Sequence, residues 1–233
     1  MVYAEILAGG TGNRYGNNIP KQYIKIYNKP IIIYTLETFI NIDDIDVIVI
    51  CCKDEWRNFI KEEISKFILT DKTIIFAKSG NDRNKTVIEG CKKIQSKFGI
   101  NDDDIILTHD AVRPIVSEET IIENIKMAKI YDAVGTYSKV INTISVIKDN
   151  IVEEIPDREI LYNTYTPQTF NLKKLMEYYY NVSEKQLEQL TDTARIFKIN
   201  GEKIYAVMSD SSNIKLTYKN DLNIIKSLVK KKK

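Results

Sequence analysis

A glycine-rich loop flanked by two cations holds the residue types best suited to chemistry. The loop spans residues 7–16 with three glycines in four positions, and Pro20-Lys21-Gln22 follows it. Glycines let backbone amides approach a phosphate closely, and Arg14 and Lys21 are spaced to fold over a triphosphate. Fixed positive charge there would stabilise the charge that develops in phosphoryl or nucleotidyl transfer. By itself the loop only suggests a polyphosphate site, because an ordinary turn or two solvated surface charges would give the same residues.

Other common kinds of catalytic and nucleotide-binding site are disfavoured. The loop matches neither the G-x-G-x-x-G nor the G-x-x-x-x-G-K-[ST] pattern, which argues against a dinucleotide enzyme and a P-loop NTPase. The chain has one histidine, His109, so a histidine triad or a multi-histidine metal site is hard to build. We expect His109 to be a packed, hydrogen-bonded residue rather than a catalyst.

Composition indicates a globular chain without a nucleic-acid surface. The 233 residues are 43% hydrophobic and 28% charged, and their net charge of +2 is exceeded by the four lysines at 230–233 alone. This composition therefore argues against an intrinsically disordered chain and against a small scaffold held together by disulfides. Cys51, Cys52 and Cys91 show no metal-ligand spacing, which fits a reducing cytoplasm. No apolar stretch approaches the roughly 18 residues of a membrane span, and no signal peptide is visible.

Alternating apolar runs and helical stretches predict the scaffold that positions the loop. Strand-like runs cover 2–8, 46–52, 74–77, 105–108 and 203–208. Helical patterns cover 31–40, 55–67, 82–97, 117–129, 171–180, 192–198 and a last stretch from about residue 220. Strands that alternate with helices need crossover connections. We therefore expect one α/β domain over residues 1–233, a Rossmann-like doubly wound, mostly parallel sheet with ligands at the carboxyl ends of its strands.

A second pattern interrupts this alternation. Residues 136–147 are rich in β-branched side chains, Lys148-Asp149-Asn150 is a turn signal, and 151–155 resumes a strand-like run. The segment predicts a protruding β-arm over about 135–157. An isolated hairpin is marginal in water, so we expect the arm to pack on a second subunit.

Six motifs along the chain resemble one enzyme family. They are Leu7-Ala8-Gly9-Gly10-x-Gly12-x-Arg14 with Pro20-Lys21-Gln22, residues 80–86 (Gly-Asn-Asp-Arg-Asn-Lys-Thr), residues 109–114 (His-Asp-Ala-Val-Arg-Pro), Arg158 with residues 166–170 (Thr-Pro-Gln-Thr-Phe), Thr191-Asp192, and residues 213–217 (Asn-Ile-Lys-Leu-Thr) with Asp221-Leu222. In this order they resemble the nucleotidyltransferases that make CDP-activated polyols, the family of ribitol-5-phosphate and 2-C-methyl-D-erythritol 4-phosphate cytidylyltransferases. The nucleotidyltransferase type of the doubly wound fold follows from this resemblance.

The resemblance implies a reaction and a set of site residues. CTP and a polyol phosphate would give a CDP-polyol and pyrophosphate, with Mg²⁺ or another divalent cation as cofactor. Arg14 and Lys21 would be the catalytic residues, stabilising the transition state at the α-phosphate. The implied CTP-binding residues are Leu7, Ala8, Gly9, Gly10, Thr11, Gly12, Gly80, Asn81, Asp82, Arg83, Thr86, Asp110 and Ala111. The implied polyol-phosphate residues are Arg158, Thr166, Lys215, Thr143, Arg113 and Asp192.

Three of these assignments also have an interpretation from the residues themselves. Gly80 allows close approach and Thr86 supplies a hydroxyl at a helix start, where amide dipoles favour an anion, although a capped helix without a ligand explains both. Asp110 ends a strand, where one carboxylate could help hold Mg²⁺ or the ribose. For Arg113, an ion pair that ties the loop is an equally good explanation.

The acceptor is the point on which the family pattern leaves a choice. The opening Tyr3-Ala4-Glu5-Ile6-Leu7-Ala8-Gly9-Gly10 resembles the ribitol branch, so we expect D-ribitol 5-phosphate and a role in teichoic acid or capsule synthesis. The alternative is 2-C-methyl-D-erythritol 4-phosphate, for isoprenoid synthesis. The chain departs from the family pattern at three positions: Asn142 stands where Asp is common, Tyr15 where Met is usual and Tyr165 where Gln is frequent. Asn142 removes a charge near the acceptor, which puts the identity of the acceptor in doubt. A non-catalytic nucleotide-binding module and a broader sugar-1-phosphate nucleotidyltransferase remain open.

Overall fold

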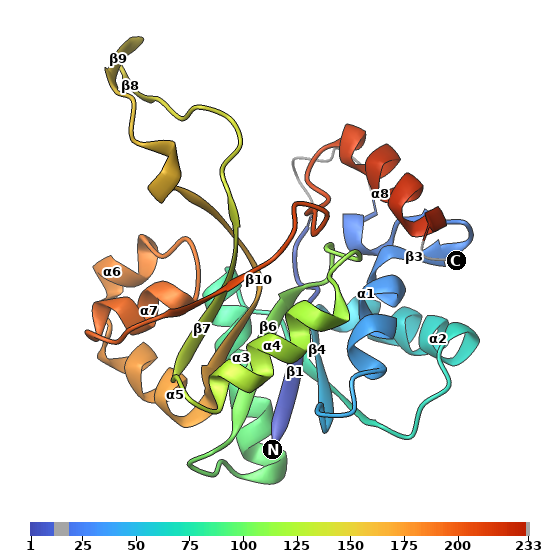
Figure 1. The fold of residues 1–233 in the computed structure, drawn as a ribbon. Coiled ribbons are helices and arrows are strands. Elements are labelled where there is room, and N and C mark those ends of the chain that lie inside the picture. Colours follow the sequence, from blue (N-terminus) through green and yellow to red (C-terminus); the bar gives the residue numbers. More distant parts are fainter. Residues whose placement is uncertain (12–18, 232–233) are drawn as a thin grey trace.

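A seven-stranded sheet forms the centre of the computed structural model, which describes residues 1–11 and 19–231 (Figure 1). Its strand order is β11-β7-β10-β6-β1-β4-β5, and β10 alone runs antiparallel to its neighbours. The strands are β1 (Val2–Leu7), β4 (Val47–Cys52), β5 (Thr73–Lys78), β6 (Ile105–Asp110), β7 (Ala133–Lys139), β10 (Tyr162–Asn171) and β11 (Tyr205–Met208). The expected doubly wound, mostly parallel sheet is confirmed.

Alternate side chains of the strands feed two separate apolar layers. Ala4 and Ile6 of β1 pack in one layer, while Tyr3 lies in the other. The first layer is covered by α1 (Ile31–Ile40), α2 (Arg57–Phe67) and α4 (Glu118–Ala128). The second is covered by α3 (Arg83–Phe98), α5 (Leu172–Asn181) and α7 (Ala194–Ile199). Burial on both faces explains why these strands are continuous apolar runs.

Smaller elements complete the body. The hairpin of β2 (Lys25–Ile26) and β3 (Lys29–Pro30) packs with α8 (Lys219–Lys231) in a third apolar cluster, and α6 (Glu184–Glu188) follows α5. Two short 3₁₀ turns, η1 (Lys21–Tyr23) and η2 (Asp54–Trp56), also lie in the body, and a third, η3 (Arg158–Ile160), lies on the arm. Of the described residues, no helix is both long and apolar enough to cross a lipid bilayer.

Strand β10 is the main element that the sequence patterns do not predict. It lies between β6 and β7, and its register shifts between Tyr165 and Thr169, with Pro167 inside the irregular stretch. Proline cannot donate to a strand ladder and is tolerated within a sheet at such irregularities. The polar residues and the proline hide this strand, and its antiparallel direction explains how the chain returns from the arm to the sheet.

The arm begins later than the predicted residue 135. Residues 133–139 form β7 in the main sheet, because the β-branched alternation of this stretch serves pairing with both β10 and β11. The protruding hairpin consists of β8 (Val146–Lys148) and β9 (Ile151–Glu154) and stands away from the body in Figure 1. Asp149 and Asn150 have φ of 50° and 63°, the left-handed pair that a two-residue hairpin turn requires.

Candidate active site

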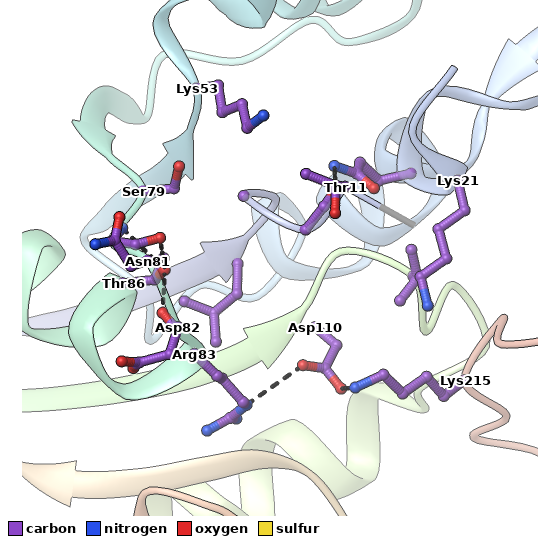
Figure 2. A pocket seen from close by; sticks show the side chains of 16 residues that line it. Thr11, Lys21, Lys53, Ser79, Asn81, Asp82, Arg83, Thr86, Asp110 and Lys215 are labelled. Atoms are coloured by element: carbon purple, nitrogen blue, oxygen red, sulfur yellow. Dashed lines mark hydrogen bonds and ion pairs between the residues drawn. The ribbon is translucent and has the colours of Figure 1, made fainter. Parts of the chain in front are cut away.

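A cavity of about 660 Å³ opens at the carboxyl ends of β1, β4, β5 and β6, where the doubly wound fold is expected to bind ligands (Figure 2). Four cationic side chains and two carboxylates line it. These charged residues are Lys21, Lys53, Arg83, Lys215, Asp82 and Asp110. The other lining residues are Leu7, Gly9, Gly10, Thr11, Gln22, Ser79, Gly80, Asn81, Thr86 and Val112. An excess of positive charge suits a polyphosphate ligand.

The glycine loop is held in place by the side chain of Gln22. The Gln22 Nε2 donates to the carbonyl oxygens of Ala8 at 2.7 Å and Gly10 at 2.8 Å. Gln22 is itself buried in the short 3₁₀ turn that carries Lys21. The Pro20-Lys21-Gln22 motif therefore couples the position of a cavity cation to the shape of the loop.

The two described glycines of the loop have different reasons to be glycine. A Cβ at Gly9 would lie 2.2 Å from the Cβ of Ser79, so Gly9 lets the loop pack against the segment after β5. A Cβ at Gly10 would meet nothing within 4 Å among the described residues. Gly9 thus serves packing within the chain, and Gly10 lies where the loop borders open cavity.

The segment from Gly80 to Thr86 forms a second wall. A Cβ at Gly80 would lie 2.5 Å from the Cβ of Lys85 and 2.8 Å from the nitrogen of Thr86. The Gly80 amide donates to Thr86 Oγ1 at 3.0 Å, and Asp82 Oδ1 caps α3 by accepting from the Lys85 amide at 2.7 Å. The glycine is therefore needed for the turn into α3, and the same turn faces the cavity (Figure 2).

Asp110 is surrounded by three cations. Its Oδ2 lies 3.0 Å from Lys215 Nζ and 3.1 Å from Arg113 Nε, and its Oδ1 lies 3.5 Å from Arg83 Nε. Burial acts to raise the pKa of Asp110, but the charges of Lys215, Arg83 and Arg113 outweigh it and hold that pKa well below its ordinary value. Asp110 is therefore a carboxylate that gathers three cations, and Figure 2 shows two of them, Arg83 and Lys215.

His109 is buried beneath this cluster as an uncharged ring. Its Nε2 lies 3.1 Å from the carbonyl oxygen of Arg113, so Nε2 carries the proton, and its Nδ1 accepts from Thr166 Oγ1 at 3.0 Å. Burial lowers the pKa of His109 to about 3. The same Thr166 oxygen accepts from the Asp110 amide at 3.3 Å. The hydroxyl of Thr166 is thereby directed at His109 and holds Asp110 in place.

The structure brings most of the expected CTP-binding residues together. Lys21 and Lys215 line the same cavity, as do ten of the thirteen residues expected to bind CTP. Those ten are Leu7, Gly9, Gly10, Thr11, Gly80, Asn81, Asp82, Arg83, Thr86 and Asp110. Ala8 and Ala111 are buried beside the cavity, where their carbonyl oxygens accept from Gln22 and Thr35. Arg14 and Gly12 lie outside the described residues.

Five of the six residues expected to bind the polyol phosphate lie away from the cavity lining. Arg113 is buried, donates to Asp110 and to the Asn213 carbonyl, and stacks 5.0 Å from the Tyr165 ring centroid. This is the loop-tying arrangement that the sequence left open. The others are Thr166, which is buried against His109; Asp192, whose Oδ1 accepts from the Arg195 amide; and Thr143 and Arg158, both exposed on the arm.

Four residues of the cavity lining are not among the site residues that the sequence predicts. Gln22, Lys53, Ser79 and Val112 become neighbours of the ligand space only through folding. Lys53 follows β4 directly, and Figure 2 shows its side chain beside the cavity, opposite Asp110 and Lys215. Its position after a buried strand was the signal that could have found it, since ligands gather at strand ends.

A divalent cation fits this site only with help from the substrate. No group of three or more His, Cys, Asp or Glu side chains gathers anywhere in the described part of the chain. Asp110 is deprotonated and lines the cavity, and among the described residues the one cation near its Oδ1 is Arg83, at 3.5 Å. Mg²⁺ takes few protein carboxylates and keeps phosphate oxygens and waters as ligands. Asp110 is therefore the residue that would hold Mg²⁺ together with a bound triphosphate.

Comparison with known proteins decides the family. Residues 2–231 match the family described as IspD, 2-C-methyl-D-erythritol 4-phosphate cytidylyltransferase. The chain belongs to this family. It is therefore a CTP-dependent cytidylyltransferase, a nucleotidyltransferase enzyme, as the sequence motifs indicate.

Solved structures of family members share the fold. The chain is similar to the 4-diphosphocytidyl-2C-methyl-D-erythritol synthase of Anaerococcus prevotii, with 28% identity, a TM-score of 0.81, and 98% of this chain and 96% of that chain covered. It is also similar to the 2-C-methyl-D-erythritol 4-phosphate cytidylyltransferase of Francisella tularensis, with 28% identity, a TM-score of 0.79, and 97% of this chain and 99% of that chain covered. The enzyme of Thermus thermophilus matches at 19% identity and a TM-score of 0.76, over 99% and 100%, which speaks for the fold alone. The expected ribitol 5-phosphate, teichoic acid and capsule roles gain no support from these matches.

Proposed function

We propose that the chain transfers CMP from CTP to 2-C-methyl-D-erythritol 4-phosphate and releases pyrophosphate. One observation carries the proposal. The glycine loop, the start of α3 and the Asp110–Lys215 pair face one cavity in a chain that matches the methylerythritol phosphate family over 230 residues, from 2 to 231. The proposal therefore takes the alternative acceptor in place of ribitol 5-phosphate.

The arrangement suits direct in-line transfer. An oxygen of the acceptor phosphate forms a bond to the α-phosphorus of CTP, and the bond from that phosphorus to the β-phosphate oxygen breaks, with both bonding electrons leaving on pyrophosphate. The attacking phosphate is already anionic at neutral pH, so positioning and charge neutralisation matter more than deprotonation. His109 is buried and uncharged, and the proposed step needs no proton transfer to or from it.

The cations of the cavity perform most of this work. Lys21, on the turn held by Gln22, and Arg14, in the loop, are proposed to stabilise the extra negative charge at the α-phosphate. Lys215 is proposed to meet the acceptor phosphate, since it is a cavity cation that lies on the opposite side of Asp110 from Arg83. Mg²⁺ bound by Asp110 and the triphosphate would supply further charge neutralisation for the leaving pyrophosphate.

The arm supports a proposal of a homodimer. The arm exposes seven apolar side chains that a monomer would leave in water, namely Ile141, Ile144, Val146, Ile147, Ile151, Val152 and Ile155. Thr143 and Arg158 lie on the same arm, outside the cavity of their own chain. We propose that a second copy covers these apolar side chains and receives Thr143 and Arg158 at its acceptor side. Monomeric mass in light scattering at micromolar concentration would contradict this.

D-ribitol 5-phosphate is the second candidate acceptor. It is favoured by Asn142 in place of the common Asp and by the loop sequence Leu7-Ala8-Gly9-Gly10. Tyr165, which packs on Arg113, also favours it. Cell-surface polymer synthesis would follow from that acceptor. In either case we propose that the enzyme works in the cytoplasm, where CTP is made.

Pyrophosphate release separates these possibilities. The purified chain is assayed with CTP, Mg²⁺ and each polyol phosphate in turn, and then with UTP or ATP in place of CTP. The proposal expects release with CTP and methylerythritol phosphate. Release with ribitol 5-phosphate alone would replace the acceptor. CTP binding without turnover of either acceptor would favour a non-catalytic module, and a preference for another nucleotide would favour a broader sugar-1-phosphate enzyme.

A further inference from the structure

Thr193 joins two consecutive residues of the cavity wall through a single hydroxyl group. Arg83 Nη1 donates to Thr193 Oγ1 at 2.6 Å, and Thr193 Oγ1 donates to Asn84 Oδ1 at 3.0 Å. Thr193 has no exposed surface, and Asn84 is also buried. The contact links the start of α7 to the start of α3, more than a hundred residues earlier in the chain.

The chemistry of the groups fixes the direction of both hydrogen bonds. A guanidinium only donates, so the Thr193 oxygen must accept from Arg83, and its one proton is then free to go to the Asn84 carbonyl oxygen. No other orientation satisfies all three side chains. The hydroxyl therefore specifies where the Arg83 guanidinium and the Asn84 amide lie.

The element behind Thr193 makes this link firm. Ala194, Ile196 and Phe197 of α7 are buried in the second apolar layer, and the Phe197 ring stacks on that of Phe170 at 5.1 Å between centroids. Thr193 directly precedes these residues. A buried hydroxyl on a packed helix loses little additional freedom when it forms its bonds, so it can hold a more mobile partner.

Arg83 needs such support. It lines the cavity and lies 3.5 Å from Asp110, which is long for a hydrogen bond, and its buried Nη2 has no hydrogen-bond partner among the described residues. Thr193 supplies the shortest contact of the guanidinium. Without that contact, a side chain with several rotatable bonds would be held in the wall mainly by charge.

We propose that Thr193 is a positioning residue for the nucleotide: its hydroxyl holds Arg83 and the first turn of α3 in the orientation that lines the CTP cavity. The identity of the nucleotide rests on the proposed function, whereas the acceptor does not enter. Thr193 itself touches no substrate in this proposal and acts through Arg83 and Asn84.

Isosteric removal of the hydroxyl is the direct test. We compare Thr193→Val with Thr193→Ser, and use Thr38→Val as a matched control, because Thr38 is a buried threonine of α1 whose hydroxyl donates to the Tyr34 carbonyl of its own helix. CTP affinity is measured by calorimetry in the presence of Mg²⁺, and folding by the thermal midpoint. We expect Thr193→Val to weaken CTP binding about tenfold, as loss of a hydrogen bond to a charged group does. Thr193→Ser and Thr38→Val should stay within about twofold of the original chain.

A double-mutant cycle with Arg83→Lys tests whether the effect passes through Arg83. If it does, adding Thr193→Val to Arg83→Lys changes CTP affinity little, because the contact is already lost. Fully additive losses, or a Thr193→Val chain that unfolds earlier but binds CTP normally, would overturn the proposal. CTP binding is read without an acceptor, so the result is independent of which polyol phosphate the enzyme uses. If the original chain binds no CTP, the proposed function fails, and the proposal that Thr193 positions residues for CTP fails with it.

Discussion

Lys215 Nζ lies 3.0 Å from Asp110 Oδ2, which joins the C-terminal segment before α8 to the end of the central strand β6. Arg113 donates to the same oxygen. One buried carboxylate thus neutralises cations that would otherwise repel each other beside a cavity. Breaking such a buried pair leaves uncompensated charge and costs more than the pair contributes.

Asp110→Asn should therefore impair both folding and activity. We expect the free energy of unfolding to fall by about 2–4 kcal/mol, because Arg113 loses its buried partner, while the half-exposed Lys215 can turn to water. Pyrophosphate release should fall by at least about a hundredfold. Chemical denaturation and a steady-state assay measure the two effects. Asp221→Asn, which removes the carboxylate that caps α8, is the control for general loss of a carboxylate, and it should keep its activity.

The Gln22 clamp can be tested without removing a cavity charge. In Gln22→Glu the two carbonyl oxygens of Ala8 and Gly10 would face a carboxylate in place of an amide donor, and both contacts would become repulsive. We expect CTP affinity to fall about tenfold or more in calorimetry, since charged groups left without a donor are costly when buried. Gln22→Met, which is neutral but cannot donate, should give a smaller loss. Equal affinities for the original chain and both variants would show that the clamp does not shape the binding site.

Particular residues show how far sequence reasoning reaches. The strands and most helices follow from apolar runs, because burial on both faces of the sheet leaves β4 without a polar residue and β6 with an apolar first half. Strand β10 is missed because Pro167 and its polar neighbours conceal it. Within the site, the glycines and the charged residues of the motifs are visible in the sequence. The roles of Gln22, Lys53 and Thr193 are not visible, because each depends on a neighbour that only folding supplies.

The acceptor residues illustrate the same limit in the opposite direction. A motif indicates that Arg113 and Thr166 lie at the site, but it does not indicate which groups are their hydrogen-bond partners. In the fold, Arg113 is engaged by Asp110 and the Asn213 carbonyl, and Thr166 by His109. Their contact with a polyol phosphate stays a prediction.

Lys53 offers a prediction that no sequence motif suggests. Its side chain is half-exposed, and its ion pair with Glu55 is loose at 4.0 Å, so its charge is available to a ligand in the cavity. We expect Lys53→Met to weaken CTP binding about three- to tenfold, with a smaller difference at high salt because screening weakens exposed charges. Lys126→Met, on the exposed side of α4, is the control and should bind CTP normally. An unchanged affinity for Lys53→Met at low salt would contradict the prediction.

Glu5 predicts a pH dependence of stability that is separate from catalysis. It is fully buried in β1, where its Oε1 accepts from Cys51 Sγ at 3.0 Å and its Oε2 has no partner among the described residues. Gly90 makes room for it, since a Cβ there would lie 1.9 Å from Oε1. Burial raises the pKa of Glu5 to about 8, although Cys51 and Arg83 act to lower it.

The sign follows from proton uptake on folding. An unfolded glutamate has its pKa near 4.3, so between about pH 4.5 and 8 the folded state binds a proton that the unfolded state has lost, and stability falls as pH rises. The slope should approach about 1.4 kcal/mol per pH unit in that window and vanish below it. Glu5→Gln, which mimics the protonated carboxyl, should remove this slope and raise the unfolding free energy at pH 7.5, whereas exposed Glu62→Gln should do neither. Denaturant titrations at pH 5, 6, 7 and 8 measure the slope, and an unchanged slope in Glu5→Gln would place the origin of the pH dependence elsewhere.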